Sequence, residues 1–199
     1  MAKRVNMEKN PNIHKLQRGY AAPTAGVIIF VAVSQFLIML IAAESIQPGY
    51  NVGTNAISDL GVGRSAAYFN TSIVILGTLT IISSYFLFVS VRSRLFSALF
   101  AVFGASSAGV GLFPETTGLP HDVFAFVIFS ATNIAAILCL RVLSSPLRYA
   151  SAALGIFGLV SLALFSGREY LGIGFGGMER MIVYPVLIWT FLLAGHLLS

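Results

Sequence analysis

Three short polar stretches of this sequence carry side chains that could do chemistry. The first, residues 51–61, reads NVGTNAISDLG. If it forms a short helix, Asn51, Asn55 and Asp59 share one face at a spacing of four residues. Ser58 lies beside that face, so a stripe of amide, carboxylate and hydroxyl groups could hydrogen-bond a polar ligand. The alternative is that Ser58 and Asp59 only form a turn before the next helix.

The second stretch, residues 113–122, reads FPETTGLPHD and carries His121. A histidine can act as a general acid or base near neutral pH. The adjacent Asp122 is expected on a different face of the same turn, so a proton relay needs a carboxylate from elsewhere, such as Asp59. The alternative is a histidine that only caps a helix.

The third stretch, residues 172–180, reads GIGFGGMER. Its glycines resemble a phosphate-binding loop, but no strand precedes them, so we expect them to permit a tight turn or close packing. Glu179 suits the N-terminus of a helix. Arg180, at the membrane edge, is expected either to extend toward the headgroups or to pair with an acid such as Asp59.

The composition places these stretches in a membrane protein. The chain has 199 residues, of which 57% are hydrophobic and only 10% charged, and its mean hydropathy is +0.87. A soluble domain with so little polar surface would aggregate, so we expect lipid to cover most of it. The net charge of +5 does not indicate nucleic acid, because the basic residues lie in short tracts beside apolar runs. Membrane lipids are the expected partner.

Six apolar runs are long enough to cross the bilayer as helices, which takes about 20 residues each. The runs cover residues 21–43, 66–91, 95–113, 123–140, 149–166 and 181–198. We therefore predict an all-α, polytopic bundle of about six transmembrane helices over residues 21–199, after a basic cytoplasmic tail over residues 1–20. Prolines are expected to open the first, fourth and fifth helices (Pro23, Pro120 and Pro146), and Pro185 to kink the sixth near Tyr184.

The distribution of charge predicts the orientation of this bundle. Basic loops near the membrane stay in the cytoplasm, and nine of the twelve Lys and Arg residues fall in the tail and the two loops on its side. We therefore expect both termini in the cytoplasm and the protein in the cell membrane. Six of the seven acids fall in or beside the outer loops, which gathers the three polar stretches at the outer face.

Small residues predict where helices pack closely. In the third run, Gly104 and Ala108 are spaced by four residues, as are Ser151 and Gly155 in the fifth. Such pairs let helix backbones approach, so we expect the third helix to be central and the fifth to be its packing partner.

The histidines do not predict a metal site. His14 and His196 are expected at the inner side and His121 at the outer side, about 30 Å of hydrocarbon apart. We therefore expect no metal ion and no other cofactor. Ser58 lacks the G-x-S-x-G turn of many serine hydrolases, so it could act as a nucleophile only if the fold brings His121 to it.

Four groups of residues, taken in order, resemble the DUF998 family of multi-pass membrane proteins: NAISDLG at 55–61, FN at 69–70, FP at 113–114 with His121, and GMER at 177–180. The resemblance covers nearly the whole chain after the basic tail. It implies six helices but no catalytic residue, since the family has no assigned function. The S-D-L-G element is also similar to the S-D-x-G element of the DRAM and Frag-like membrane proteins, which implies a lipid-related role.

Two functional hypotheses follow from these stretches. The first is a non-enzymatic bundle whose outer pocket binds a lipid headgroup, a partner protein or a second copy of the chain, with Asn51, Asn55, Asp59, His121, Glu179 and Arg180 as ligand-binding residues. The second is a membrane-interface hydrolase or acyl-transfer enzyme acting on a lipid. In that enzyme His121 is the base, Asp59 orients it, Arg180 steadies an anionic group, and Ser58 is the candidate nucleophile.

Overall fold

Six long helices make up most of the structure. The computed structural model describes residues 11–91 and 93–199, and in this part of the chain it contains α-helices and 3-10 helices and no strand. The α-helices are α1 (Pro11–Ile46), α2 (Ala66–Ser90), α3 (Arg94–Leu112), α4 (Leu119–Val142), α5 (Leu147–Ser166) and α6 (Gly174–Leu198). The 3-10 helices are η2 (Ser58–Gly61), η3 (Gly63–Ser65) and η4 (Glu115–Thr117).

Each of the six α-helices is long and apolar enough to cross a membrane. The prediction of an all-α, multi-pass membrane protein is therefore confirmed. The fourth and sixth helices begin earlier than their apolar runs. The sixth begins at Gly174 because Glu179 and Arg180 are buried against other parts of the protein, and so they do not end the helix at a water boundary.

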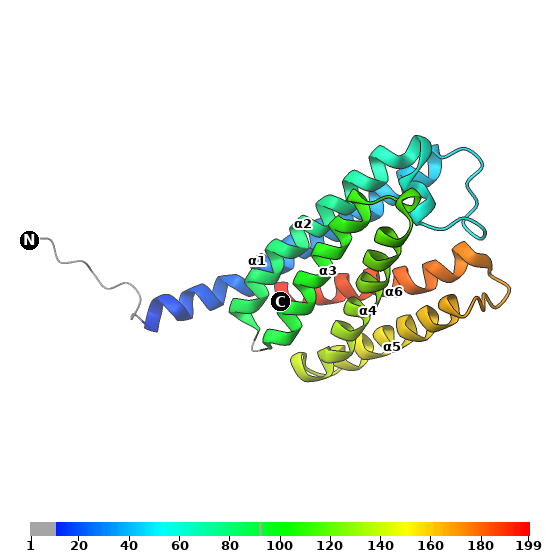
Figure 1. The fold of residues 1–199 in the computed structure, drawn as a ribbon. Coiled ribbons are helices and arrows are strands. Elements are labelled where there is room, and N and C mark those ends of the chain that lie inside the picture. Colours follow the sequence, from blue (N-terminus) through cyan, green and yellow to red (C-terminus); the bar gives the residue numbers. More distant parts are fainter. Residues whose placement is uncertain (1–10, 92) are drawn as a thin grey trace, which may run out of the picture.

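The prolines only partly mark the helix starts. Pro120 is the second residue of α4, and Pro146 directly precedes α5. The prediction that Pro23 opens the first helix is wrong, because α1 begins at Pro11 and continues through Pro23. The apolar run marks where the chain enters lipid, whereas the helix starts earlier and projects beyond the bundle (Figure 1). Pro185 lies inside α6, and the kink at this position stays a prediction.

The helices form a closed ring. Each helix packs against the next one in the chain, and α6 packs against α1. Figure 1 shows two ends of this ring. The loop end carries the α1–α2, α3–α4 and α5–α6 connections, and the termini end carries the other two connections and the C-terminus.

Small residues set the spacing of two helix pairs. A Cβ atom on Gly77 of α2 would lie 2.5 Å from the carbonyl oxygen of Gly104 on α3, so these helices are in backbone contact. On α5, a Cβ atom on Gly155 would lie 2.6 Å from the carbonyl oxygen of Asn133 on α4. The expected pairing of the third and fifth helices is wrong, because α3 packs between α2 and α4 and α5 packs between α4 and α6. Residue spacing identifies a face that packs closely, but not its partner.

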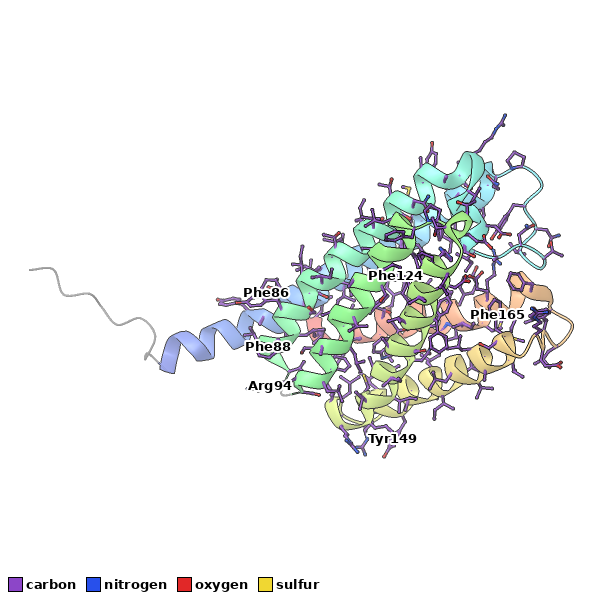
Figure 2. All side chains as sticks on the ribbon, viewed as in Figure 1. Phe86, Phe88, Arg94, Phe124, Tyr149 and Phe165 are labelled. Carbon is purple, nitrogen blue, oxygen red and sulfur yellow. The ribbon has the colours of Figure 1, made fainter. Side chains whose placement is uncertain are left out.

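Aromatic side chains fill the ring near the termini end. Trp189 of α6 is fully buried, and its ring centroid lies 5.8 Å from that of Phe100 and 6.5 Å from that of Phe96, both on α3. Apolar side chains also cover the outside of the ring, among them Phe88 of α2, which is 53% exposed (Figure 2). A membrane would cover these outer side chains with lipid.

Candidate ligand-binding site

A cavity lies inside the ring, between the aromatic cluster and the loop end. About 70 Å³ of it is open to the centre of a water-sized molecule. Every long helix except α5 contributes to its wall, together with η2. The apolar part of the wall includes Phe36, Ile73, Leu76, Phe103, Ile128, Phe129, Val183 and Leu187, and the polar part is Ser58, Ser107, His121 and Glu179.

The side chain of His121 contributes to the wall of this cavity. Its side chain is only 5% exposed, in the first turn of α4. The Nδ1 atom lies 2.9 Å from the carbonyl oxygen of Phe113. A carbonyl only accepts hydrogen bonds, so Nδ1 carries a proton; Nε2 is then an acceptor in the neutral ring and a donor in the cationic ring. Within the described residues Nε2 has no hydrogen-bond partner, so a ligand could supply one.

Glu179 connects the cavity to the loop above it. Its side chain is 6% exposed, and one carboxylate oxygen accepts a hydrogen bond from the backbone N–H of Ile57. Ile57 directly precedes η2, so this bond holds Ser58, the first residue of η2, at the cavity wall. The hydroxyl of Ser58 has no hydrogen-bond partner among the described residues, so it can hydrogen-bond a molecule in the cavity.

Arg180 belongs to a different part of the loop end. Its Nη2 atom donates to Glu44 at 2.7 Å and to the Tyr50 hydroxyl at 2.5 Å. Its Nη1 atom donates to the carbonyl oxygens of Val52, Asn55 and Gly176 at 2.8–3.1 Å. The expected pairing with an acid is confirmed, but the acid is Glu44 and not Asp59.

This arginine anchors the long connection between α1 and α2. Tyr50 bonds both Arg180 and the carbonyl oxygen of Ala56, and burial raises the pKa of its hydroxyl to about 12. Both Nη atoms of Arg180 are bonded within the protein, so only its buried Nε–H, which has no partner among the described residues, is left for the predicted role in steadying an anionic group.

Glycines bring the same connection onto the start of α6. The backbone N–H groups of Gly176 and Gly177 donate to the carbonyl oxygen of Gly53. A side chain on Gly176 would overlap the carbonyl of Asn55. The glycine-rich stretch therefore serves close packing, as predicted, and binds backbone rather than phosphate.

The residues from Asn51 to Asp59 do not form the short helix considered above. They make turns, and helical structure begins only at Ser58, in η2. The side chains still meet, because Asn55 accepts from the backbone N–H of Asn51 at 3.1 Å and donates to Asp59 at 2.9 Å. Asp59 also accepts from the backbone N–H of Ala56 at 3.1 Å. These bonds stabilise the loop itself.

Asp59 does not orient His121. The same carboxylate oxygen of Asp59 accepts both loop bonds, while the ring of His121 is oriented by the carbonyl of Phe113. The relay between Asp59 and His121 expected for an enzyme is therefore wrong. Of the six residues predicted to bind a ligand, His121 and Glu179 line the cavity, as does Ser58 from the enzyme hypothesis.

A second carboxyl group lies beside Asp59. Glu115 of η4 is half-buried, and its pKa is raised to about 7, first by burial and then by its contact with Asp59. The charges of Glu179 and Asp122 raise this pKa further. Four carboxyl groups, those of Asp59, Glu115, Asp122 and Glu179, thus lie close enough at the loop end for their charges to interact.

The described residues contain no group of three or more His, Cys, Asp or Glu side chains placed to hold a metal ion. His121 lies at the start of α4, at the loop end, and His196 lies near the end of α6, at the termini end. The side chain of His14 lies outside what the structure describes.

The residues that sequence reasoning missed are Glu44, Tyr50 and Glu115. Glu44 had a detectable signal, because an acid that ends one apolar run and an arginine that precedes another both need a partner at the membrane edge. Tyr50 and Glu115 had none, since their roles depend on how three connections meet.

Comparison with known proteins agrees with this architecture. No curated protein and no solved structure matches the chain. The model of one family, described as "Protein of unknown function (DUF998)", matches residues 25–196. That range covers all six membrane-spanning segments almost completely, so the chain belongs to the DUF998 family.

Proposed function

We propose that this integral membrane protein binds a small amphiphile inside its helix ring. The observation that carries the proposal is one cavity with two kinds of wall: apolar side chains toward the membrane centre, and Ser58, His121 and Glu179 toward the loop end. An apolar tail would occupy the first part, and a polar headgroup would contact the second.

The polar end favours a headgroup that donates hydrogen bonds. In the neutral ring with its proton on Nδ1, Nε2 of His121 is an acceptor, and the carboxyl group of Glu179 offers acceptor oxygens. Asp59 and Glu115 add negative potential nearby, while Arg180 is bonded within the protein. A hydroxyl, an amide N–H or an ammonium group suits these surroundings, whereas a phosphate would meet repulsion.

The proposal extends the first of the two hypotheses. It differs from the second because the headgroup donates hydrogen bonds, whereas the second hypothesis has Arg180 steady an anionic group. The similarity of the S-D-L-G element to DRAM and Frag-like proteins supports a lipid-related role. The outward orientation of the loop end and a location in the cell membrane, both inferred from the charge distribution, are also part of the proposal.

Filling the cavity tests the proposal. Ile128→Trp adds an indole to the apolar wall, and Ile156→Trp makes the same change on α5, where Ile156 is 54% exposed outside the ring. We expect lipid extraction and mass spectrometry to find an amphiphile with a donor headgroup on wild-type protein and on Ile156→Trp. Ile128→Trp should lose it. Equal amounts on all three folded proteins would show that the amphiphile binds elsewhere.

The second candidate function, ester hydrolysis or acyl transfer, is favoured by one observation. Ser58, a possible nucleophile, and His121, a possible base, line the same cavity. Phenylalanine side chains make much of the cavity wall apolar, and an apolar wall suits an acyl chain.

A fluorophosphonate probe tests this candidate. If the protein is such an enzyme, the probe should modify Ser58, detected by peptide mass spectrometry, and His121→Ala should lower the labelling rate by about 100-fold or more. Asp59→Asn should have little effect, because Asp59 bonds the loop and not His121. No adduct at Ser58 in folded protein would leave amphiphile binding without chemistry.

A further inference from the structure

A second hollow lies at the opposite end of the ring and is independent of the proposed amphiphile site. It is formed where α2, α4 and α6 end and where α3 begins, and about 390 Å³ of it is open to the centre of a water-sized molecule. We call it the basic groove. Its polar side chains are Ser90, Ser93, Arg141 and His196, and the rest of its wall is valine and leucine.

The charge in the basic groove has one sign. Among the described residues, Arg141 and His196 are the groups in its wall that can be cationic, and no acidic side chain lines it. The chain also has no acid between residues 123 and 168 or after Glu179. The side chain of Arg141 is exposed and has no hydrogen bond or ion pair within the described residues. This guanidinium is therefore available to an anion.

The backbone adds to this positive potential. Ser93 is the N-cap of α3, a helix of 19 residues, and its hydroxyl accepts a bond from the N–H of Phe96 at 3.2 Å. Its own hydroxyl proton stays free to donate. The positive end of the α3 dipole therefore opens into the groove beside Arg141 and His196, and such a helix start favours phosphate-like anions.

We propose that the basic groove binds a phosphate group. A guanidinium, an imidazole, a serine hydroxyl and a helix N-terminus are the donors that phosphate oxygens accept from. The source could be free phosphate or an anionic phospholipid. Leu193 and Leu197 line the groove beside these donors, in a helix that is apolar enough to span the membrane. These two leucines would suit the acyl chains of a lipid.

The test measures binding to purified, folded protein by native mass spectrometry. The probes are phosphatidylglycerol, phosphatidylcholine and inorganic phosphate. We expect phosphatidylglycerol to be retained over phosphatidylcholine, and Arg141→Gln to weaken its binding about fivefold, the effect of one cation near a lipid surface. The double variant Arg141→Gln, His196→Gln should weaken it further. Arg64→Gln, which removes the same charge from an exposed position at the loop end, is the matched control.

The outcomes separate the two sources and the failure of the idea. Competition by millimolar inorganic phosphate, without preference among lipids, would support a free phosphate site. If phosphatidylglycerol stays bound in the presence of the same millimolar phosphate, the result would support a lipid site. Unchanged binding by Arg141→Gln would overturn the proposal, because it would show that the groove does not bind the lipid. An equal loss in Arg64→Gln would also overturn it, because the effect would then come from net charge alone. A melting curve for each variant shows that the fold is retained.

Discussion

Glu179 and Arg180 are neighbours in the chain, yet their side chains serve different parts of the molecule. Successive residues of a helix point about 100° apart, so one helix start can serve two environments. Glu179 points into the cavity and bonds the backbone of Ile57, whereas Arg180 bonds Glu44, Tyr50 and the loop carbonyls. The two charges therefore belong to separate functions, one to the candidate site and one to the support of its loop.

Arg180→Gln should destabilise the protein. It leaves the partly buried carboxylate of Glu44 without its cation and several loop carbonyls without a donor. Breaking such a buried pair costs about 3–5 kcal/mol, and the 21% exposure of the Glu44 side chain puts the expected loss near the lower limit. Chemical unfolding followed by circular dichroism in detergent would measure it.

Two further variants show whether the loss of stability comes from the broken ion pair. Arg64→Gln, at an exposed site of the same end, should change stability by less than about 0.5 kcal/mol. Adding Glu44→Gln to Arg180→Gln should restore part of the loss, because the isolated carboxylate is then neutral. If Arg180→Gln unfolds at the same denaturant concentration as wild type, the ion pair does not anchor the loop.

At the scale of elements, apolar runs predicted the number and order of the helices, but not all of their ends. The second, third and fifth helices end within two residues of their runs, because loops or charges bound those runs on both sides. The first and sixth helices start well before theirs. Polar side chains such as Glu179 and Arg180 look like a helix boundary in the sequence, and they remain helical because other segments supply their hydrogen bonds.

The connection between α1 and α2 illustrates the same limit. Its amides and Asp59 were predicted to form a stripe on a helix, and a hydrogen-bonded chain from Asn51 through Asn55 to Asp59 does exist. The backbone between them makes turns instead, since the carbonyls of Val52, Gly53 and Asn55 accept hydrogen bonds from α6. Contact with a distant helix decided the local conformation.

For the whole molecule, the helix ring and the charge distribution predict a membrane orientation that can be measured. Thr116 at the loop end and Ser199 at the termini end are exposed, and the native Cys139 is buried. In intact cells, a membrane-impermeant maleimide should label Thr116→Cys and leave Ser199→Cys unlabelled until the membrane is opened. Cys139 should stay unlabelled in wild type. Labelling of Ser199→Cys alone in intact cells would reverse the orientation.

The amino-acid sequence by itself determined that this protein has six helices able to cross the membrane and that six of its seven acids fall in or beside three connections, because hydropathy and charge act locally along a chain. Only the tertiary structure decided which of those polar residues share a site. Arg180 and Glu44 are 136 positions apart, and Ser58, His121 and Glu179 come from three elements. Closing the helix ring brought them together, and packing between distant segments leaves no periodic mark in a sequence.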